Sequence, residues 1–424
     1  NTDAAEAAIK LYTSNNSEFY SIVKRWDNTK RKLTINCSNM LSAKTTYKLL
    51  MNSGVRDKEG IEIAPFTAFT FTTTDNGNGS ENDPYLIFTA AQLDNVREKL
   101  TSHYKLERDI DIATSTYISE NNTADKGWLP IGDSRESFTG GFNGNGHIIT
   151  GISINRPGKD SMGLFGQISD AKIENVHMTY GSIVGEDSCG SIIGYSYHSN
   201  ITNCVNEGVN VKGSSYIGGI IGSVYSTNIT KCRNNGNVEC LEDKAGGITG
   251  WTKDISKLSI CKNSGTVVSM NNHVGGITGY NNGTVENCFN EGNVTAYSYA
   301  GGIVGSNNVS GKVDRCISIG NTSVTNLGEN NYGGICGYTD GTANVTNNII
   351  TDSTSLNGFT CNAAEQTVGN YNEGSDQKKN YFFNSISAIN SAVRAAANWS
   401  DSEVWSGQIW QLSNSELPAL IGLP

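Results

Sequence analysis

The sequence predicts an all-β protein whose main part is a right-handed parallel β-helix, a solenoid of coils about 28 residues long. Two short motifs recur with one shared period across residues 161–350. The chain of 424 residues contains 48 Gly and only 17% charged residues, a composition typical of short strands joined by tight turns. Each repeat offers two or three short strands and no helical pattern, so it buries its apolar face only by stacking on its neighbours.

The first motif is Gly-Ile-x-Gly, which occurs seven times with small variations. The first residues of its copies lie 28, 28, 28, 29, 26 and 32 positions apart. If each repeat is one coil, equivalent residues lie above one another. The second position is always aliphatic, which predicts an inward column: Leu164, Ile192, Ile220, Ile248, Ile277, Ile303 and Ile335. The last Gly is expected to face inward at a corner, where a side chain does not fit or the backbone needs a positive φ.

The second motif, Cys-x-Asn-x-Gly, runs in phase with the first. Its copies begin at Cys204, Cys232, Cys261 and Cys288, and a copy that lacks the Asn begins at Cys316. The Asn residues form a predicted column at a turn, where each side-chain amide bonds that of the next coil and Asn tolerates a left-handed φ. The members of this column are Asn206, Asn234, Asn263 and Asn290.

The five cysteines of the second motif are predicted to be reduced and buried. A zinc site needs ligands that converge on one point, whereas these residues are spread along an axis without accompanying His. Disulfides between adjacent coils would join side chains with the same direction, which fits bridge geometry poorly. We therefore expect small buried hydrophobes here, with no metal site and no cofactor.

The ends of a solenoid expose strand edges, so we expect caps there. Residues 90–100 have helical periodicity after Thr89, a suitable N-cap, and residues 104–112 are predicted as a strand of the same cap. At the other end, residues 388–398 are predicted as a helix. Three tryptophans near it are expected to fill the cap core: Trp399, Trp405 and Trp410.

The repeats resemble the GLUG motif of bacterial surface proteins, whose Gly-Leu-x-Gly core is reproduced by residues 163–166. The runs at residues 128–132 and 138–147 look like the first coil entry of that family. The resemblance covers residues 80 to 424 and implies a β-helical stalk on exported proteins. Some metallopeptidases directed at IgA carry such repeats, but none of the five His here is followed by Glu, so their His-Glu-x-x-His zinc motif is absent.

The N-terminal stretch resembles the later part of a bacterial Ig-like domain, which ends in Phe-Thr-Thr. Residues 32–37 alternate like a strand, residues 41–50 lead into a turn at 54–60, and residues 69–73 close the unit. The usual first strand is hard to find, which leaves open whether the domain is complete. The predicted organisation is an Ig-like β-sandwich at 1–74, a linker at 75–84 and the solenoid at 85–424. Within the solenoid we expect a cap and first coil (85–160), repeat coils (161–350), and a last coil with the C-terminal cap (351–424).

Signatures of catalysis are scarce in the sequence. It contains no Gly-x-Ser-x-Gly, no Gly-Lys-Ser/Thr and no Cys-x-x-Cys. Polysaccharide lyases and hydrolases on β-helices need clustered carboxylates over adjacent coils. Here the acids are expected to occur singly in solvated turns, beside Asn or Ser of the next coil. Glu207 and Glu291 share one turn position three coils apart, and the pairs at 186–187 and 242–243 lie two coils apart. We therefore predict no catalytic residues and no enzyme.

An aromatic stripe is the main candidate binding site. If side chains alternate along the strand, the residue after each Gly-Ile-x-Gly faces solvent: Tyr195, Ser223, Trp251, Tyr280, Ser306 and Tyr338. The four aromatic members, Tyr195, Trp251, Tyr280 and Tyr338, suit stacking on sugar rings or contact with a protein partner. The alternative is that corner geometry breaks the alternation, or that a loop covers these rings.

We expect a non-catalytic cell-surface adhesin or structural stalk that binds glycans or host extracellular proteins. A polysaccharide-active enzyme and a carbohydrate-binding module are the alternatives. The net charge of −10 argues against nucleic acid as a partner, and no apolar run is long enough to span a membrane. We expect a monomer that is extracellular or attached to the outer membrane. Because the chain begins at Asn1 rather than Met, it is read as processed, and its lack of a signal peptide says nothing about location.

Overall fold

The computed structural model describes residues 76–113, 126–326, 331–340, 343–346 and 348–351, with short segments before and after them. The chain forms two compact units, Asn1–Asn78 and Gly79–Pro424. The helix predicted at 388–398 lies outside the described residues, as do Trp399 and Trp405. Trp410 begins β44 (Trp410–Gln411), which pairs with β45 (Ala419–Leu420).

The N-terminal unit is built from antiparallel strands. A four-stranded sheet has the order β2-β1-β5-β6, and β3 pairs with β4. The strands are β1 (Ile9–Thr13), β2 (Glu18–Phe19), β3 (Val23–Trp26), β4 (Leu33–Asn36), β5 (Thr46–Met51) and β6 (Phe69–Thr72). Strand β1, which was hard to find in the sequence, pairs with β5 over its full length and buries Leu11 against that strand.

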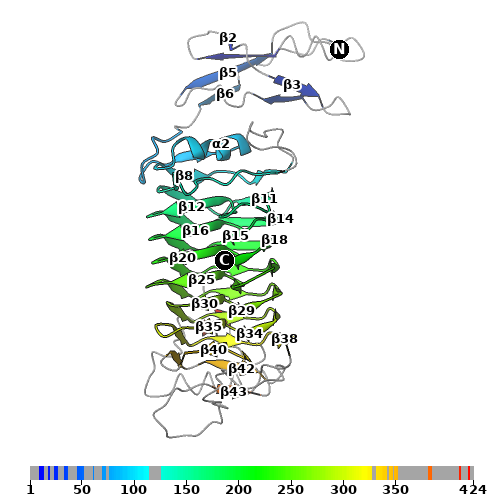
Figure 1. The fold of residues 1–424 in the computed structure, drawn as a ribbon. Coiled ribbons are helices and arrows are strands. Elements are labelled where there is room, and N and C mark those ends of the chain that lie inside the picture. The colour runs from blue at the N-terminus through cyan, green and yellow to red at the C-terminus, as the bar shows by residue number, and fades with distance from the viewer. Residues whose placement is uncertain are drawn as a thin grey trace. The chain divides into compact units, whose positions relative to one another are not determined.

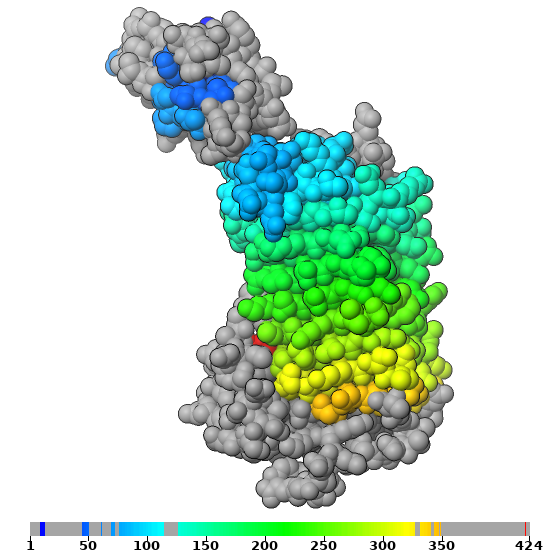
Figure 2. Space-filling model, turned by 90° about the vertical axis from the view of Figure 1, so that its left-hand side faces the viewer, coloured from blue at the N-terminus to red at the C-terminus, as the bar shows by residue number. Residues whose placement is uncertain are grey.

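The second unit is the predicted parallel β-helix, and its strands form four parallel sheets along one axis (Figure 1). In the space-filling view the coils follow one another as bands from cyan to orange (Figure 2). The seven-stranded sheet contains β12 (Phe165–Ser169), β16 (Ile193–Tyr197), β20 (Ile221–Tyr225), β25 (Thr249–Lys253), β30 (Thr278–Asn281), β35 (Val304–Asn307) and β40 (Cys336–Thr339). The six-stranded sheet contains β15 (Asp187–Cys189), β19 (Ser215–Gly218), β24 (Ala245–Gly246), β29 (Asn272–Gly275), β34 (Ser298–Gly301) and β39 (Tyr332–Gly333).

Two longer sheets complete the solenoid. The ten-stranded sheet contains β7 (Tyr85–Ile87), β8 (His103–Leu106), β10 (Gly141–Asn143), β13 (Lys172–Glu174), β17 (Asn200–Thr202), β21 (Asn228–Thr230), β26 (Lys257–Ser259), β31 (Thr284–Glu286), β36 (Lys312–Asp314) and β41 (Asn344–Thr346). The fourteen-stranded sheet contains β9 (Ile110–Asp111), β11 (Ile148–Asn155), β14 (His177–Val184), β18 (Val205–Gly213), β22 (Arg233–Asn234), β23 (Val238–Cys240), β27 (Lys262–Asn263), β28 (Val267–Ser269), β32 (Phe289–Asn290), β33 (Val294–Ala296), β37 (Ile317–Ser318), β38 (Thr322–Val324), β42 (Ile349–Thr351) and β43 (Tyr381–Phe383). A coil therefore has more strands than the two or three predicted, because corners and the Asn-x-Gly bend divide it.

One set of corners is made by residues in the left-handed backbone conformation. This corner column lies within or beside the strands of the six-stranded sheet, and its φ values run from 56° to 67°. Its members are Ser161, Ser188, Tyr216, Lys244, His273 and Tyr299. Left-handed φ is unusual for large side chains, so the stacked coils must hold these residues in place. Four of them, Ser188, Tyr216, His273 and Tyr299, lie inside strands of the six-stranded sheet, so the left-handed residue bends each of these strands.

The closing Gly of the first motif packs against this corner. A Cβ on Gly222 would lie 2.3 Å from the carbonyl carbon of Ser188, and a Cβ on Gly250 would lie 2.3 Å from that of Tyr216. Neither Gly has a positive φ. Of the two reasons expected for Gly, the steric one is correct and the backbone one is wrong, since it is the neighbouring corner residue that adopts the left-handed conformation.

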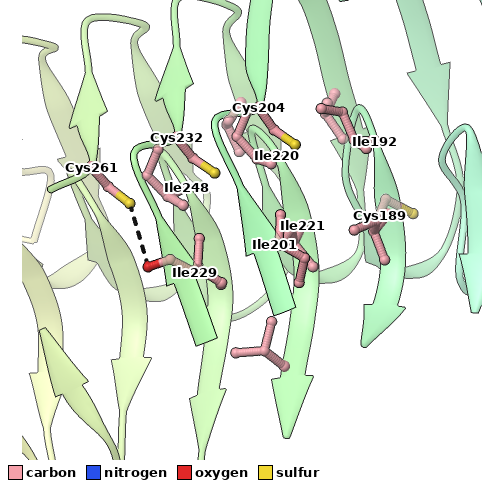
Figure 3. Packing of buried hydrophobic residues seen from close by; sticks show 14 of the residues in the cluster. Cys189, Ile192, Ile201, Cys204, Ile220, Ile221, Ile229, Cys232, Ile248 and Cys261 are labelled. Carbon is pink, nitrogen blue, oxygen red and sulfur yellow. Dashed lines mark hydrogen bonds between the residues drawn. The ribbon is translucent and has the colours of Figure 1, made fainter. Parts of the chain in front are cut away.

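The core is a stack of aliphatic and thiol columns (Figure 3). All seven aliphatic residues of the first motif are fully buried, as are the five cysteines of the second. The described cysteines are free, and the thiol of Cys261 lies near the carbonyl oxygens of Ser259 (3.3 Å) and Ile229 (4.0 Å). Burial raises the pKa of Cys189 and Cys240 to about 12, so both remain protonated and unreactive thiols.

The Asn column is a ladder of side-chain hydrogen bonds inside the core. Each amide nitrogen donates to the amide oxygen of the next coil, from Asn206 to Asn234 (2.8 Å), Asn234 to Asn263 (2.8 Å) and Asn263 to Asn290 (2.9 Å). The predicted ladder is correct, but its predicted place at a left-handed turn is wrong. These residues lie in strands, are fully buried and do not have positive φ.

The two motifs share a period because they touch. A Cβ on Gly219, the first residue of one Gly-Ile-x-Gly copy, would lie 2.3 Å from Cγ of Asn234. The same approach joins Gly247 to Asn263 at 2.2 Å. The bulk of the Asn side chain thus fills the space that the first Gly leaves free, and a change in either would disturb the other.

The N-terminal cap is shorter and more broken than predicted. The helix α2 (Ala90–Asp94) has Thr89 as N-cap, whose hydroxyl accepts a hydrogen bond from the Gln92 amide, and a 3-10 turn, η1 (Asn95–Glu98), follows it. The strand predicted at 104–112 is divided into β8 and β9, which pair in different sheets because the chain turns a corner between them. Leu93, Val96 and Leu100 close the core of the first coil.

Candidate binding surface

The predicted stripe is one column of the seven-stranded sheet. The pairing register aligns Tyr195, Ser223, Trp251, Tyr280, Ser306 and Tyr338 on adjacent strands. The flanking residues of each strand point into the core, so the aromatic members lie on the outer face. Tyr338 is 37% exposed, and Tyr195, Trp251 and Tyr280 are half-buried.

The two serines of the column do not face solvent as predicted. Ser223 and Ser306 are 1% and 2% exposed, respectively. The hydroxyl of Ser223 lies 3.0 Å from that of Ser188, and the hydroxyl of Ser306 forms a hydrogen bond with Nδ1 of His273. The corner residues of the neighbouring coils therefore cover these small side chains, and alternation alone could not predict this.

The corner column completes a continuous aromatic ladder, a name used here for the six rings of Tyr216, Trp251, Tyr280, His273, Tyr299 and Tyr338. Tyr216 stacks on Trp251 with 5.0 Å between ring centroids, and Trp251 meets Tyr280 edge to face at 6.2 Å. His273 contacts Tyr280 at 5.4 Å and stacks on Tyr299 at 5.0 Å, and Tyr299 contacts Tyr338 at 5.7 Å. Rings from two sheets thus form one surface along the axis.

Half of this ladder was missed in the sequence, although a signal was present. Tyr216, Lys244, His273 and Tyr299 each lie three residues before a copy of the first motif. An alignment on that motif shows the column. The members of this column reach the predicted stripe because their backbone is left-handed. Tyr, Lys and His rarely adopt this conformation, so the sequence does not predict it.

Two lysines flank the middle of the aromatic ladder. The Lys253 ammonium lies 3.5 Å from the centroid of the Trp251 ring. The Lys244 ammonium lies 5.1 Å from the Tyr216 ring, 5.3 Å from Trp251 and 5.5 Å from Tyr280. These are favourable cation–π distances. Lys244 also pairs with Asp243 at 2.6 Å.

His273 is uncharged at neutral pH in this setting. Burial among the rings of Tyr280 and Tyr299 disfavours the imidazolium and lowers the pKa of His273, and the positive charge of Lys244 acts in the same direction. Asp243, whose carboxylate lies 3.9 Å from Nε2, opposes this shift but does not outweigh burial. The aromatic ladder therefore presents a neutral ring here at pH 7.

A second, smaller group of rings lies near Tyr195 on the same sheet. Tyr197 and Tyr225 stack with centroids 5.2 Å apart, and His198 lies 3.8 Å from Tyr197. Burial raises the pKa of Tyr195, and both tyrosines add to this effect. The buried Ser223 separates Tyr195 from Trp251 in the column. Of the four predicted site residues, the structure therefore joins Trp251, Tyr280 and Tyr338 and places Tyr195 apart.

The expectation that carboxylates occur singly is wrong. Glu286 and Asp314 lie directly opposite each other on β31 and β36. Asp187 and Asp160 also lie on adjacent coils, since the amide of Asp187 donates to the Asp160 carboxylate at 3.2 Å. These acids lie outside the two repeated motifs, so the sequence does not show which of them are aligned on adjacent coils.

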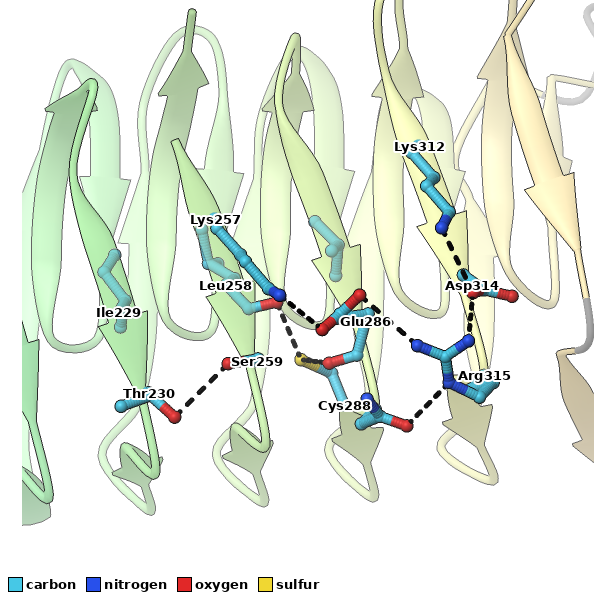
Figure 4. Close-up of polar contacts among 12 residues, drawn as sticks. Ile229, Thr230, Lys257, Leu258, Ser259, Glu286, Cys288, Lys312, Asp314 and Arg315 are labelled. Atoms are coloured by element: carbon cyan, nitrogen blue, oxygen red, sulfur yellow. Dashed lines mark hydrogen bonds and ion pairs between the residues drawn. The ribbon is translucent and has the colours of Figure 1, made fainter. Parts of the chain in front are cut away.

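Both acidic pairs have structural partners. Lys257 binds Glu286 at 2.7 Å, Arg315 bridges Glu286 and Asp314, and Lys312 lies 3.4 Å from Asp314 (Figure 4). Side-chain exposure is 15% for Glu286 and 4% for Asp314. Both carboxylates are therefore paired with Lys and Arg side chains and have little contact with solvent.

At the other pair, burial raises the pKa of Asp187, and Asp160 adds to the shift. Asp187 accepts a hydrogen bond from the Ser215 amide of the next coil. Among the described residues, no group of His, Cys, Asp and Glu side chains could hold a metal ion. The acids of these two pairs connect coils.

Family comparison agrees with the resemblance stated from the sequence. Residues 1–73 match the bacterial Ig-like domain, and residues 270–295 match the GLUG motif. A protein of Evansella cellulosilytica described as a Gly-rich membrane protein is 40% identical over 127 residues, which are 28% of this chain and 14% of that protein. Halomucin of Haloquadratum walsbyi is 37% identical over 137 residues, which are 31% of this chain and 2% of halomucin. The chain thus spans only a small part of either relative.

Two solved structures resemble the chain over most of its length. One is a protein from Bacteroides ovatus assigned as an immunoglobulin A1 protease, with 19% identity and a TM-score of 0.44 over 81% of this chain and 94% of that chain. The other is an IgA1 protease, with 12% identity and a TM-score of 0.39 over 82% of this chain and 28% of that chain. At these values neither likeness carries an argument about activity. No helix in the described part of the chain is long and apolar enough to cross a membrane.

Proposed function

We propose that this chain is a non-catalytic adhesin or structural stalk of the bacterial cell surface, and that it binds glycans along the seven-stranded sheet. The observation that carries the proposal is the aromatic ladder, in which six rings follow one another without interruption on a rigid scaffold. Rings fixed in this way stack on the apolar faces of sugars at little entropic cost. The bacterial Ig-like domain and the GLUG motif support an extracellular or outer-membrane location.

The aromatic ladder suits an extended ligand better than a small one. Its rings come from successive coils, which lie about 4.8 Å apart along the axis. A glycan chain lying along the sheet would meet one ring after another, so weak contacts would add up within one molecule. We propose that the chain acts as a monomer, with host extracellular proteins as the competing class of partner.

An enzyme on the same scaffold is the second candidate, and the opposed Glu286 and Asp314 are the observation that favours it. General acid–base work needs a carboxyl that exchanges a proton with the substrate. Each of these two is held by cations, and Asp314 also accepts a hydrogen bond from Thr346 at 2.9 Å. We therefore favour a role for this pair in joining coils.

Removing two rings from the aromatic ladder tests the proposal. The double variant Trp251→Ala, Tyr280→Ala should bind its glycan roughly five- to 150-fold more weakly, since each aromatic contact contributes roughly 0.5–1.5 kcal/mol beyond its buried area. Both rings are on the outer face, so the thermal midpoint should fall by only a few degrees. Binding is measured on a glycan array and then by titration calorimetry with the best ligand.

Tyr180→Ala is the matched control, because Tyr180 is a 75% exposed ring on β14, in the fourteen-stranded sheet. It should leave binding unchanged. A wild-type protein that captures no glycan on the array, or equal affinities for the wild type and the double variant, would remove the basis for the proposal. Capture of host extracellular proteins alone would favour the competing class.

A further inference from the structure

We propose that the glycan recognised by the aromatic ladder is an acidic one, whose carboxylate binds between Lys253 and Lys244 beside the Trp251 ring. This inference rests on the proposed function and assigns the chemical class of its ligand. The elements that build the site are β25, which carries Trp251 and Lys253, and the corner before β24, which carries Lys244.

Lys253 is the cation of this site that lacks a counter-charge. Lys244 is paired with Asp243 at 2.6 Å, whereas Lys253 forms no ion pair with any described residue. Its ammonium lies 3.5 Å from the centroid of the Trp251 ring, so its charge lies at the aromatic ladder itself. The nearby Asp254 carboxylate accepts a hydrogen bond from the Ser226 hydroxyl at 2.6 Å. A ring face with one uncompensated ammonium suits a sugar that carries a carboxylate.

Lys244 is the second positive charge beside Lys253 at this point. Burial lowers the pKa of Lys253, and the charge of Lys244 lowers it further, as expected where two cations share a partly desolvated surface. His273, the next member of the corner column, is neutral at pH 7 and does not add charge. An anion placed between the two ammonium groups would relieve their repulsion.

The indole of Trp251 offers a further donor. Its Nε1 is buried and finds no acceptor among the described residues. An unpaired buried donor costs about 1–3 kcal/mol, so such groups are uncommon unless a ligand or water completes them. Lys253 is a flexible side chain that lies against the same ring. If it turns toward a bound carboxylate, the face of the indole is free for a sugar ring, and a sugar oxygen at the indole edge would supply the acceptor that Nε1 lacks.

A pair of matched probes tests this inference. Oligogalacturonate carries a carboxylate on each sugar, and its fully methyl-esterified form has the same length without the charge. At low ionic strength the protein should bind the acid about tenfold more tightly than the ester, and the difference should shrink at high salt because the charges are partly exposed. Titration calorimetry of both probes gives the ratio.

Variants at Lys253 identify the residue responsible. Lys253→Met keeps the aliphatic stem on the Trp251 ring and removes the charge, so the preference for the acid should fall below about threefold. Lys253→Arg keeps the charge and should preserve the preference. Lys212→Met is the control for a general loss of positive charge, since Lys212 lies on β18 and pairs with Glu239 at 2.6 Å. It should leave the ratio unchanged.

The outcomes separate this inference from the proposed function. Equal binding of acid and ester, or an acid preference that persists in Lys253→Met, overturns the inference. If neither probe binds while neutral glycans on the array bind and lose affinity in the double variant Trp251→Ala, Tyr280→Ala, the inference falls and the proposed function stands. If no glycan binds at all, both fall together.

Discussion

Ile248→Asp is expected to unfold the middle of the solenoid. Ile248 is fully buried, and its backbone bonds Ile220 of the preceding coil and Ile277 of the following one. A carboxyl at this position enters a core of aliphatic side chains and thiols, and its charge, or the neutralisation of that charge, costs more than about 4 kcal/mol. We expect a large fall of the urea midpoint, measured by circular dichroism.

Glu291→Ala is the comparison for this variant. Glu291 lies at the surface of the same solenoid and binds Lys262 at 2.9 Å and Ser264 at 3.0 Å. Loss of one such surface pair costs about 1 kcal/mol or less. Similar urea midpoints for the two variants would show that the aliphatic column does not form the core.

Asn234→Ala is expected to have the second largest effect. The side chain of Asn234 donates to the Gly236 carbonyl and the Asn263 amide oxygen, and accepts from the Gly236 amide and Asn206. Its removal leaves several buried polar groups without partners, each at a cost of about 1–3 kcal/mol. It also opens a cavity against Gly219. The total loss should exceed about 3 kcal/mol in urea unfolding.

The neighbouring Asn235 provides the control. Its side-chain amide donates a long hydrogen bond of 3.4 Å to the Glu207 carboxylate, and the residue is half-buried. Asn235→Ala should change the free energy of unfolding by about 0.5 kcal/mol or less. Equal effects of the two substitutions would mean that the ladder of amides does not stabilise the stack.

The inward side of the fold could be predicted because equivalent positions repeat the same residue. An aliphatic residue recurs at one position of all seven copies of the first motif, and Asn recurs at another position on four successive coils, so both columns could be predicted. The role of the first Gly of the Gly-Ile-x-Gly motif could not be predicted, because the contact of Gly219 with Asn234 joins positions 15 residues apart across the coil. The period of the repeat shows which positions are equivalent, but it does not show which different positions are in contact.

The outer face was predicted less completely. The register of Trp251, Tyr280 and Tyr338 follows from the motif, but their neighbours Tyr216 and Tyr299 reach them only through a left-handed corner. The pairing of Glu286 with Asp314 was missed because it lies in the ten-stranded sheet, outside both motifs. Where the repeat varies from coil to coil, the residue type alone does not fix register or exposure.

The most direct test of the central claim is to ask whether a bound glycan remains intact. The glycan that the protein captures best is incubated with it for a day, and the products are separated by size and assayed for reducing ends and unsaturated sugars. We predict that the glycan is recovered at its original length while tryptophan fluorescence reports binding. Shorter or unsaturated products that vanish in Glu286→Gln, Asp314→Asn but persist in Trp251→Ala, Tyr280→Ala would contradict the account and establish an enzyme in place of an adhesin.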